Sequence, residues 1–266
     1  MALSPDEIRS QVSASYGARV RPTLEASSDL IPLIDASASC CSAESSCCGS
    51  DAADVDITNI ARLYADTDIT DLPATVTDVA FGCGNPTAIA ALQPGEVVLD
   101  LGSGGGIDCF LAAKMVGPDG RVYGVDMTPE MVALARKNAA TVGATGVEFR
   151  LGEIEHLPID SGSVDVIISN CVINLSPDKP QVFREAFRVL RPGGRLQVSD
   201  IVWTQPVPAG LEADMDQWAA CIAGAIEERD YLAQIAAAGF TDVTSVTSEY
   251  SGARGLASAD IVAFKP

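Results

Sequence analysis

Short apolar segments alternate with segments of helical length from residue 95 onward, and this alternation restricts the chain to few folds. Residues 97–101 (VVLDL) are a continuously apolar run, as in strands that are covered on both faces. Further strands are predicted at residues 122–126, 147–150, 164–168 and 195–201, with helices between them at residues 107–115, 129–141 and 180–190. Such regular alternation predicts an α/β fold: a doubly wound, mostly parallel sheet with right-handed crossovers.

The segments on either side of this core differ from it. Ser4 and the proline and acids that follow it predict a helix that ends near residue 16 or 17. Residues 26–53 have the composition of a loop, and helices are predicted at 211–224 and 231–238. Strands at 243–250 and 261–264 would form an antiparallel pair at the sheet edge, making seven strands. We expect an N-terminal helical and loop extension (1–86), a Rossmann-like core (87–204), and helices that cover a substrate plus the last two strands (205–266).

Composition narrows the classes of partner. The formal net charge of −19 argues against nucleic acid, which needs a basic face. No stretch is apolar enough to span a bilayer, and the first residues lack the features of a signal peptide. We therefore expect a cytoplasmic protein, with no membrane partner and monomeric by default. In that compartment its eight cysteines indicate binding or catalysis rather than structural disulfides.

A glycine-rich loop, GSGGG at residues 102–106, joins the first core strand to the next helix, and Asp126 ends the second strand. Ligands of such sheets bind at the carboxyl ends of the strands. The loop spacing departs from the dinucleotide pattern, and with Asp100 and the turn at 191–194 it resembles class I S-adenosylmethionine-dependent methyltransferases over residues 93–200. That resemblance implies a methyltransferase sheet with S-adenosylmethionine as cofactor. The expected cofactor-binding residues are Asp100, Gly102, Ser103, Gly104, Asp126, Met127, Ile154, Glu155 and Asn170.

Three cysteines far apart in the sequence fall where this fold would bring them to one crevice. Cys83 lies in a glycine turn before the core, Cys171 just past the fourth strand, and Cys221 in a helical segment beyond the fifth. Cys109, on the helix after the glycine loop, is instead expected to be a small core residue.

The segments around these cysteines are GCGNP (82–86), SNCVINL (169–175) and WAACIAGA (218–225), and they resemble the signatures of arsenite methyltransferases. The resemblance covers about residues 5–240. It implies that Cys83, Cys171 and Cys221 hold trivalent arsenic as thiolates, with no separate metal site. It also implies a fourth, N-terminal cysteine, Cys47 or Cys48, with Cys40 and Cys41 less favoured. One departure is Phe81, where members often have tyrosine. Many members also carry a further C-terminal domain, which we do not expect here.

The chemistry that follows is methyl transfer to arsenic, a route of arsenic detoxification. Soft thiolates match a soft, thiophilic element, and the site contributes mainly positioning and exclusion of water. The positive sulfonium should favour the thiolate form of the cysteines. We expect arsenite or its thiol conjugates as substrate and a reductant of the glutathione or thioredoxin type as co-substrate. Two alternatives stay open: a methyltransferase acting on a small organic molecule, and a metalloid-binding protein without turnover.

Overall fold

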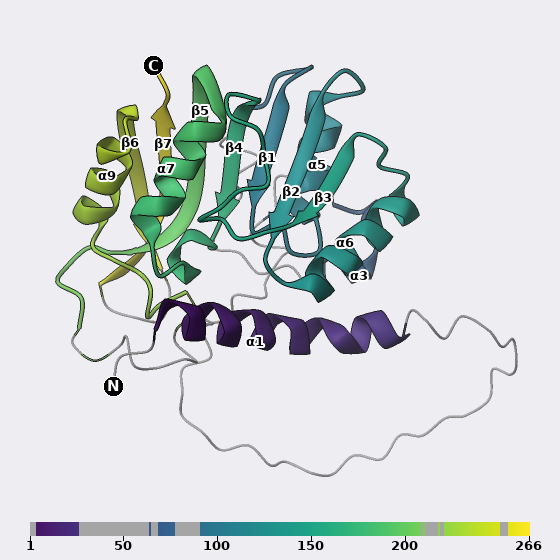
Figure 1. Cartoon of the computed structure of the whole chain (residues 1–266), viewed down its shortest axis with the longest axis horizontal. Helices are drawn as coiled ribbons and strands as arrows, with labels where there is room; N and C mark the ends of the chain where they lie inside the picture. Colours follow the sequence, from purple (N-terminus) through teal and green to yellow (C-terminus); the bar gives the residue numbers. More distant parts are fainter. Residues whose placement is uncertain are drawn as a thin grey trace, which may run out of the picture.

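The computed structural model describes residues 4–26, 64, 69–77, 91–208, 210, 218, 221–250 and 255–266. Within them a single seven-stranded sheet has the order β3-β2-β1-β4-β5-β7-β6 (Figure 1). The strands are listed with their bounds as β1 Val97–Leu101, β2 Arg121–Asp126, β3 Val147–Leu151, β4 Val164–Asn170, β5 Leu190–Trp203, β6 Thr241–Glu249 and β7 Leu256–Phe264. The first five run parallel, while β7 is antiparallel to both of its neighbours, β5 and β6. The predicted doubly wound, mostly parallel sheet with an antiparallel edge is therefore confirmed.

Helices cover both faces of the sheet, and each face has its own apolar core. Their bounds are α1 Pro5–Ala26, α3 Ala74–Thr77, α5 Ile107–Val116, α6 Pro129–Val142, α7 Lys179–Val189 and α9 Glu228–Ala237, with a 3-10 turn, η1, at Ile173–Leu175. One core packs α7 and α9 against the sheet, and the other packs α3, α5 and α6 against its opposite face. No helix in the described ranges is both long and apolar enough to cross a membrane.

Turn residues fix where the core helices begin and end. Asp178 accepts a hydrogen bond from the backbone N–H of Gln181 at 3.1 Å and so caps α7. Gly143, with φ of 68°, ends α6 in the left-handed conformation that glycine adopts without strain. These boundaries fall within a few residues of those predicted.

Three elements are longer than predicted. α1 continues from residue 17 to Ala26, because Val20 is buried against α6 and Arg21 pairs with Glu130 at 3.0 Å. β5 begins at Leu190 rather than residue 195, since the predicted turn pairs with Lys265 while the strand continues. β7 begins at Leu256 rather than residue 261 and pairs with β5 up to Trp203. The predicted cover helix at 211–224 lies mostly outside the described residues, and its predicted end at 221–224, which includes Cys221, forms turns and not a helix.

Helix α1 lies across the edge of the sheet at which the parallel strands end, below that edge in Figure 1. Its N-terminal turn is closed by reciprocal hydrogen bonds: the Ser4 hydroxyl accepts from the Glu7 N–H at 3.3 Å, and the Glu7 carboxylate accepts from the Ser4 N–H at 2.8 Å. Ile8, Val12 and Val20, which are four and eight residues apart and so lie on one face of the helix, are buried. The helix therefore closes one side of the crevice at the strand ends.

Candidate active site

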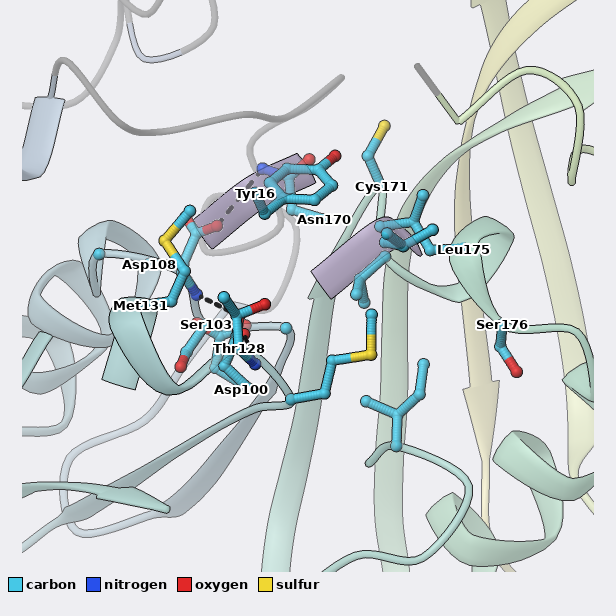
Figure 2. A pocket seen from close by; sticks show the side chains of 18 of the residues that line it. Tyr16, Asp100, Ser103, Asp108, Thr128, Met131, Asn170, Cys171, Leu175 and Ser176 are labelled. Atoms are coloured by element: carbon cyan, nitrogen blue, oxygen red, sulfur yellow. Dashed lines mark hydrogen bonds between the residues drawn. The ribbon is translucent and has the colours of Figure 1, made fainter. Parts of the chain in front are cut away.

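A pocket opens at the carboxyl ends of β1, β2 and β4, between the glycine loop and α1. Figure 2 shows its walls: Asp100, Ser103 and Asp108 lie on one side, and Cys171 and Leu175 on the other. All nine residues predicted to bind the cofactor line this one pocket: Asp100, Gly102, Ser103, Gly104, Asp126, Met127, Ile154, Glu155 and Asn170. The sequence pattern thus identified a set of residues that the fold brings together.

The glycine loop has a shape that only glycine permits at several positions. Gly102, Gly104 and Gly106 have φ values of 69°, 50° and 98°, in the region that other residues rarely adopt. A Cβ on Gly104 would meet nothing within 4 Å, so its backbone faces open space that a ligand can approach. The N–H of Gly104 donates to Asp126 Oδ2 at 2.9 Å, and the N–H of Thr128 donates to Oδ1 at 2.8 Å. Each Asp126 oxygen therefore keeps further acceptor capacity for a pair of ligand hydroxyls.

Two buried carboxyl groups lie beside the loop. Asp108 accepts hydrogen bonds from the Tyr64 hydroxyl at 2.8 Å and from Asn170 Nδ2 at 3.3 Å. Burial raises the pKa of Asp108 to about 6 and holds the pKa of Asp100 well above its usual range. Cys109 is fully buried, as predicted, and its thiol donates to Asp100 Oδ2 at 3.2 Å.

The expected adenine side of the pocket is supported from α1. Ile154 is buried in the wall, and the Glu155 carboxylate accepts from the Ser176 hydroxyl at 2.7 Å and from Arg9 Nη1 at 3.4 Å. Arg9 also pairs with Glu153 at 3.6 Å. Glu155 is thus fixed by two partners that sequence reasoning did not single out.

Cys171 and Cys221 are neighbours in the structure. The Cys221 thiol donates a hydrogen bond to the backbone oxygen of Cys171 at 2.8 Å. Both residues have left-handed backbones, with φ of 58° and 62°. Burial, followed by the charge of Asp200, raises the pKa of the Cys221 thiol.

The turn that carries Cys171 packs directly on the glycine loop. A Cβ on Gly102 would overlap the side chain of Val172, so that position needs glycine for space as well as for its backbone conformation. Cys171 is disulfide-bonded in the structure, whereas Cys109 and Cys221 have free thiols. The predicted ligand Cys83 and the N-terminal Cys40, Cys41, Cys47 and Cys48 lie outside the described residues.

Several pocket residues were missed by sequence reasoning. Those from α1 are Arg9, Val12 and Tyr16, and the others include Tyr64, Asp108 and Ser176. The four-residue spacing of Val12 and Tyr16 was an available signal for a buried helix face, and Asp108 was an acid among the apolar residues that begin its helix. In the described part of the chain, no three His, Cys, Asp or Glu residues are grouped so as to hold a metal ion.

Comparisons with known proteins agree with this geometry. Residues 92–239 match the family described as "Methyltransferase domain". The chain is 45% identical to an arsenite methyltransferase of Halobacterium salinarum, over 98% of this chain and 68% of that protein. It is 39% identical to the human arsenite methyltransferase over 57% of this chain, and it spans only 43% of that protein. The crystal structure of an arsenic(III) S-adenosylmethionine methyltransferase from Chlamydomonas reinhardtii matches with a TM-score of 0.65 and 35% identity, over 77% of this chain and 72% of that one.

Proposed function

This chain belongs to the arsenite methyltransferase family, and we propose that it methylates trivalent arsenic held by Cys83, Cys171 and Cys221, with S-adenosylmethionine as the methyl donor. The observation that carries the proposal is the contact between the two halves of the site. The turn that begins at Cys171 lies against Gly102 of the loop predicted to hold the donor, and the Cys221 thiol contacts the backbone of Cys171.

The residues of the pocket fit that donor. The open backbone at Gly104 suits close approach of its methionine end, the Asp126 carboxylate suits two ribose hydroxyls, and apolar Met127 and Ile154 suit the adenine ring. When bound, the sulfonium supplies an electrophilic methyl group that the lone pair of trivalent arsenic can attack. No general base is required, because arsenic loses no proton.

The chain's own contribution is positioning and exclusion of water. Val12, Val172 and Leu175 give the pocket apolar walls, and α1 closes its side, so that the reacting atoms are kept from solvent. Thiolate sulfur is the ligand type that a soft element selects, and sulfurs from different turns would orient the arsenic lone pair.

The state of Cys171 bears on the proposed reductant. A disulfide-bonded Cys171 must be reduced before its sulfur can bind arsenic, and two thiols of the glutathione or thioredoxin type would supply the two electrons and become a disulfide. We therefore propose such a thiol as co-substrate.

Methyl transfer from labelled S-adenosylmethionine to arsenite, in excess reduced thiol, tests the function. Cys171→Ser should lose turnover while still binding the cofactor. Cys109→Ser makes the same replacement at a buried cysteine behind the loop and should keep turnover. Wild-type protein that binds cofactor but methylates no arsenite would refute the proposal and direct the search to organic acceptors.

A further inference from the structure

Each of the two cysteines is followed directly by a hydrogen-bonded turn. The Leu175 N–H donates to the Val172 backbone oxygen at 2.9 Å, and the Ala225 N–H donates to the Ile222 backbone oxygen at 3.1 Å. A Cβ on Gly224 would overlap the backbone oxygen of Asn174. Gly224 is not among the residues with a left-handed backbone, so glycine is required there for close approach and not for conformation.

Three polar groups of Asn174 are hydrogen-bonded, while its buried Oδ1 has no hydrogen-bond partner among the described residues. Its N–H donates to Asp200 Oδ2 at 3.2 Å, and its Nδ2 donates to the backbone oxygen of Ile201 at 2.6 Å. Its own backbone oxygen accepts from Lys179 Nζ at 3.3 Å, and the same ammonium donates to the backbone oxygen of Ser176 at 3.0 Å. Asn174 and Asp200 are completely buried. The surface on which Gly224 rests is therefore fixed to β5.

We propose that the contact between Gly224 and Asn174 sets the separation of the Cys171 and Cys221 sulfurs and thereby matches the site to arsenic. Lys179, which donates to the backbone oxygen of Asn174, is a positioning residue with them. This inference rests on the proposed function. A spacing set by backbone against backbone is stiff, because it can change only if a whole turn moves in a close-packed region. Larger thiophilic ions, such as antimony, need a wider separation of sulfurs and would fit less well.

Gly224→Ala tests this contact. The added methyl group should push the Cys221 turn away from Asn174 and raise the KM for arsenite about 10–100-fold, the range found when residues that support metal ligands are removed. The Kd for cofactor should not change, since Gly224 does not line the pocket. The ratio of arsenite to antimonite affinity should fall, a change that general destabilisation would not produce. Tryptophan fluorescence can report both affinities, because Trp218 lies close to Cys221, whose N–H donates to the backbone oxygen of Trp218 at 2.9 Å.

Gly146→Ala is the matched control. Its backbone is not left-handed, and the nearest atom to an added Cβ is 3.8 Å away, so all of these quantities should stay at wild-type values.

Lys179→Met keeps the length of the side chain but removes the ammonium that donates to Asn174 and Ser176. This variant tests the inference if Gly224→Ala fails to fold. It should raise the KM for arsenite with cofactor affinity unchanged. Lys114→Met, at a half-exposed lysine on α5, is its control. Folded variants with wild-type arsenite affinity and selectivity would overturn the inference. If Cys221→Ser also binds arsenite normally, the proposed function fails instead, so the two failures can be distinguished.

Discussion

Backbone strain at the residue scale coincides with the proposed arsenic ligands. Four non-glycine residues in the described part of the chain have a left-handed backbone, and Cys171 and Cys221 are two of them. Such conformations cost on the order of 1 kcal/mol or more each and persist where the surroundings hold them. At Cys221 this backbone accompanies a hydrogen bond from the thiol to the backbone oxygen of Cys171 at 2.8 Å.

Replacing Cys171 measures that strain. Under reducing conditions, Cys171→Gly should be more stable than Cys171→Ala by about 1 kcal/mol, since glycine adopts positive φ freely. At Cys109, inside α5, the order should reverse: the Cys109→Gly variant should be less stable than the Cys109→Ala variant by about 1 kcal/mol. Denaturant unfolding of the four variants gives both differences. Equal stabilities at residue 171 would show that the backbone there is not strained in solution.

The buried Asp108 carboxyl should make stability depend on pH. Its pKa is about 6 in the folded protein, above the usual value of 3.8, so the folded state binds the proton more tightly than the unfolded state. Its contribution to stability is therefore greatest at low pH and falls as pH rises from about 4 through about 6. Asp108→Asn should flatten this part of the profile, which thermal unfolding from about pH 4 to pH 7 will measure. A wild-type slope in the variant would mean that other carboxyls cause it.

Among the elements, α1 shows how tertiary contacts extend a helix beyond its local signals. Its start was predictable from Ser4 and Pro5, but its extension to Ala26 depends on contacts of Val20 and Arg21 with α6. The core strands could be predicted from local sequence alone, because a strand that is buried on both faces is a short, continuously apolar run. Sequence therefore predicted the core strands and the start of α1, but not the extension of α1 to Ala26 or its place beside the pocket.

Arg9 should hold α1 over the pocket. Its partner Glu155 is buried with only 4% of its side chain exposed, so this ion pair is worth more than a surface pair. Arg9→Gln should weaken cofactor binding about three- to tenfold, equivalent to roughly 1 kcal/mol. Calorimetric titration with the cofactor measures this effect. Arg229→Gln, at an arginine that is 82% exposed, should bind as wild type, and equal affinity in both variants would show that α1 does not support the pocket.

At the scale of the whole molecule, the site combines parts of different origin. The glycine loop, Asp126 and Cys171 follow three parallel strands, so the topology alone brings them together and their convergence could be predicted. Tyr16 and Arg9 come from α1, and the close contact of Gly224 with Asn174 joins segments fifty residues apart in the chain. The contact between Gly224 and Asn174 depends on packing between two turns, and no local pattern in the sequence predicts such packing.

The net charge of −19 should make the stability of the folded protein rise with salt. The chain has thirty-six acidic residues and only seventeen Lys and Arg. The excess negative charges repel one another more strongly in the compact state than in the unfolded chain. Screening of that repulsion outweighs the loss of exposed ion pairs, which contribute little individually. The Tm should rise by about 3–6 °C between about 0.05 and 0.5 M sodium chloride, the change expected for 1–2 kcal/mol in a chain of this size. Sucrose at matched osmolality controls for solute exclusion, and a Tm that falls with salt would mean that ion pairs such as Arg9–Glu155 dominate over the net charge.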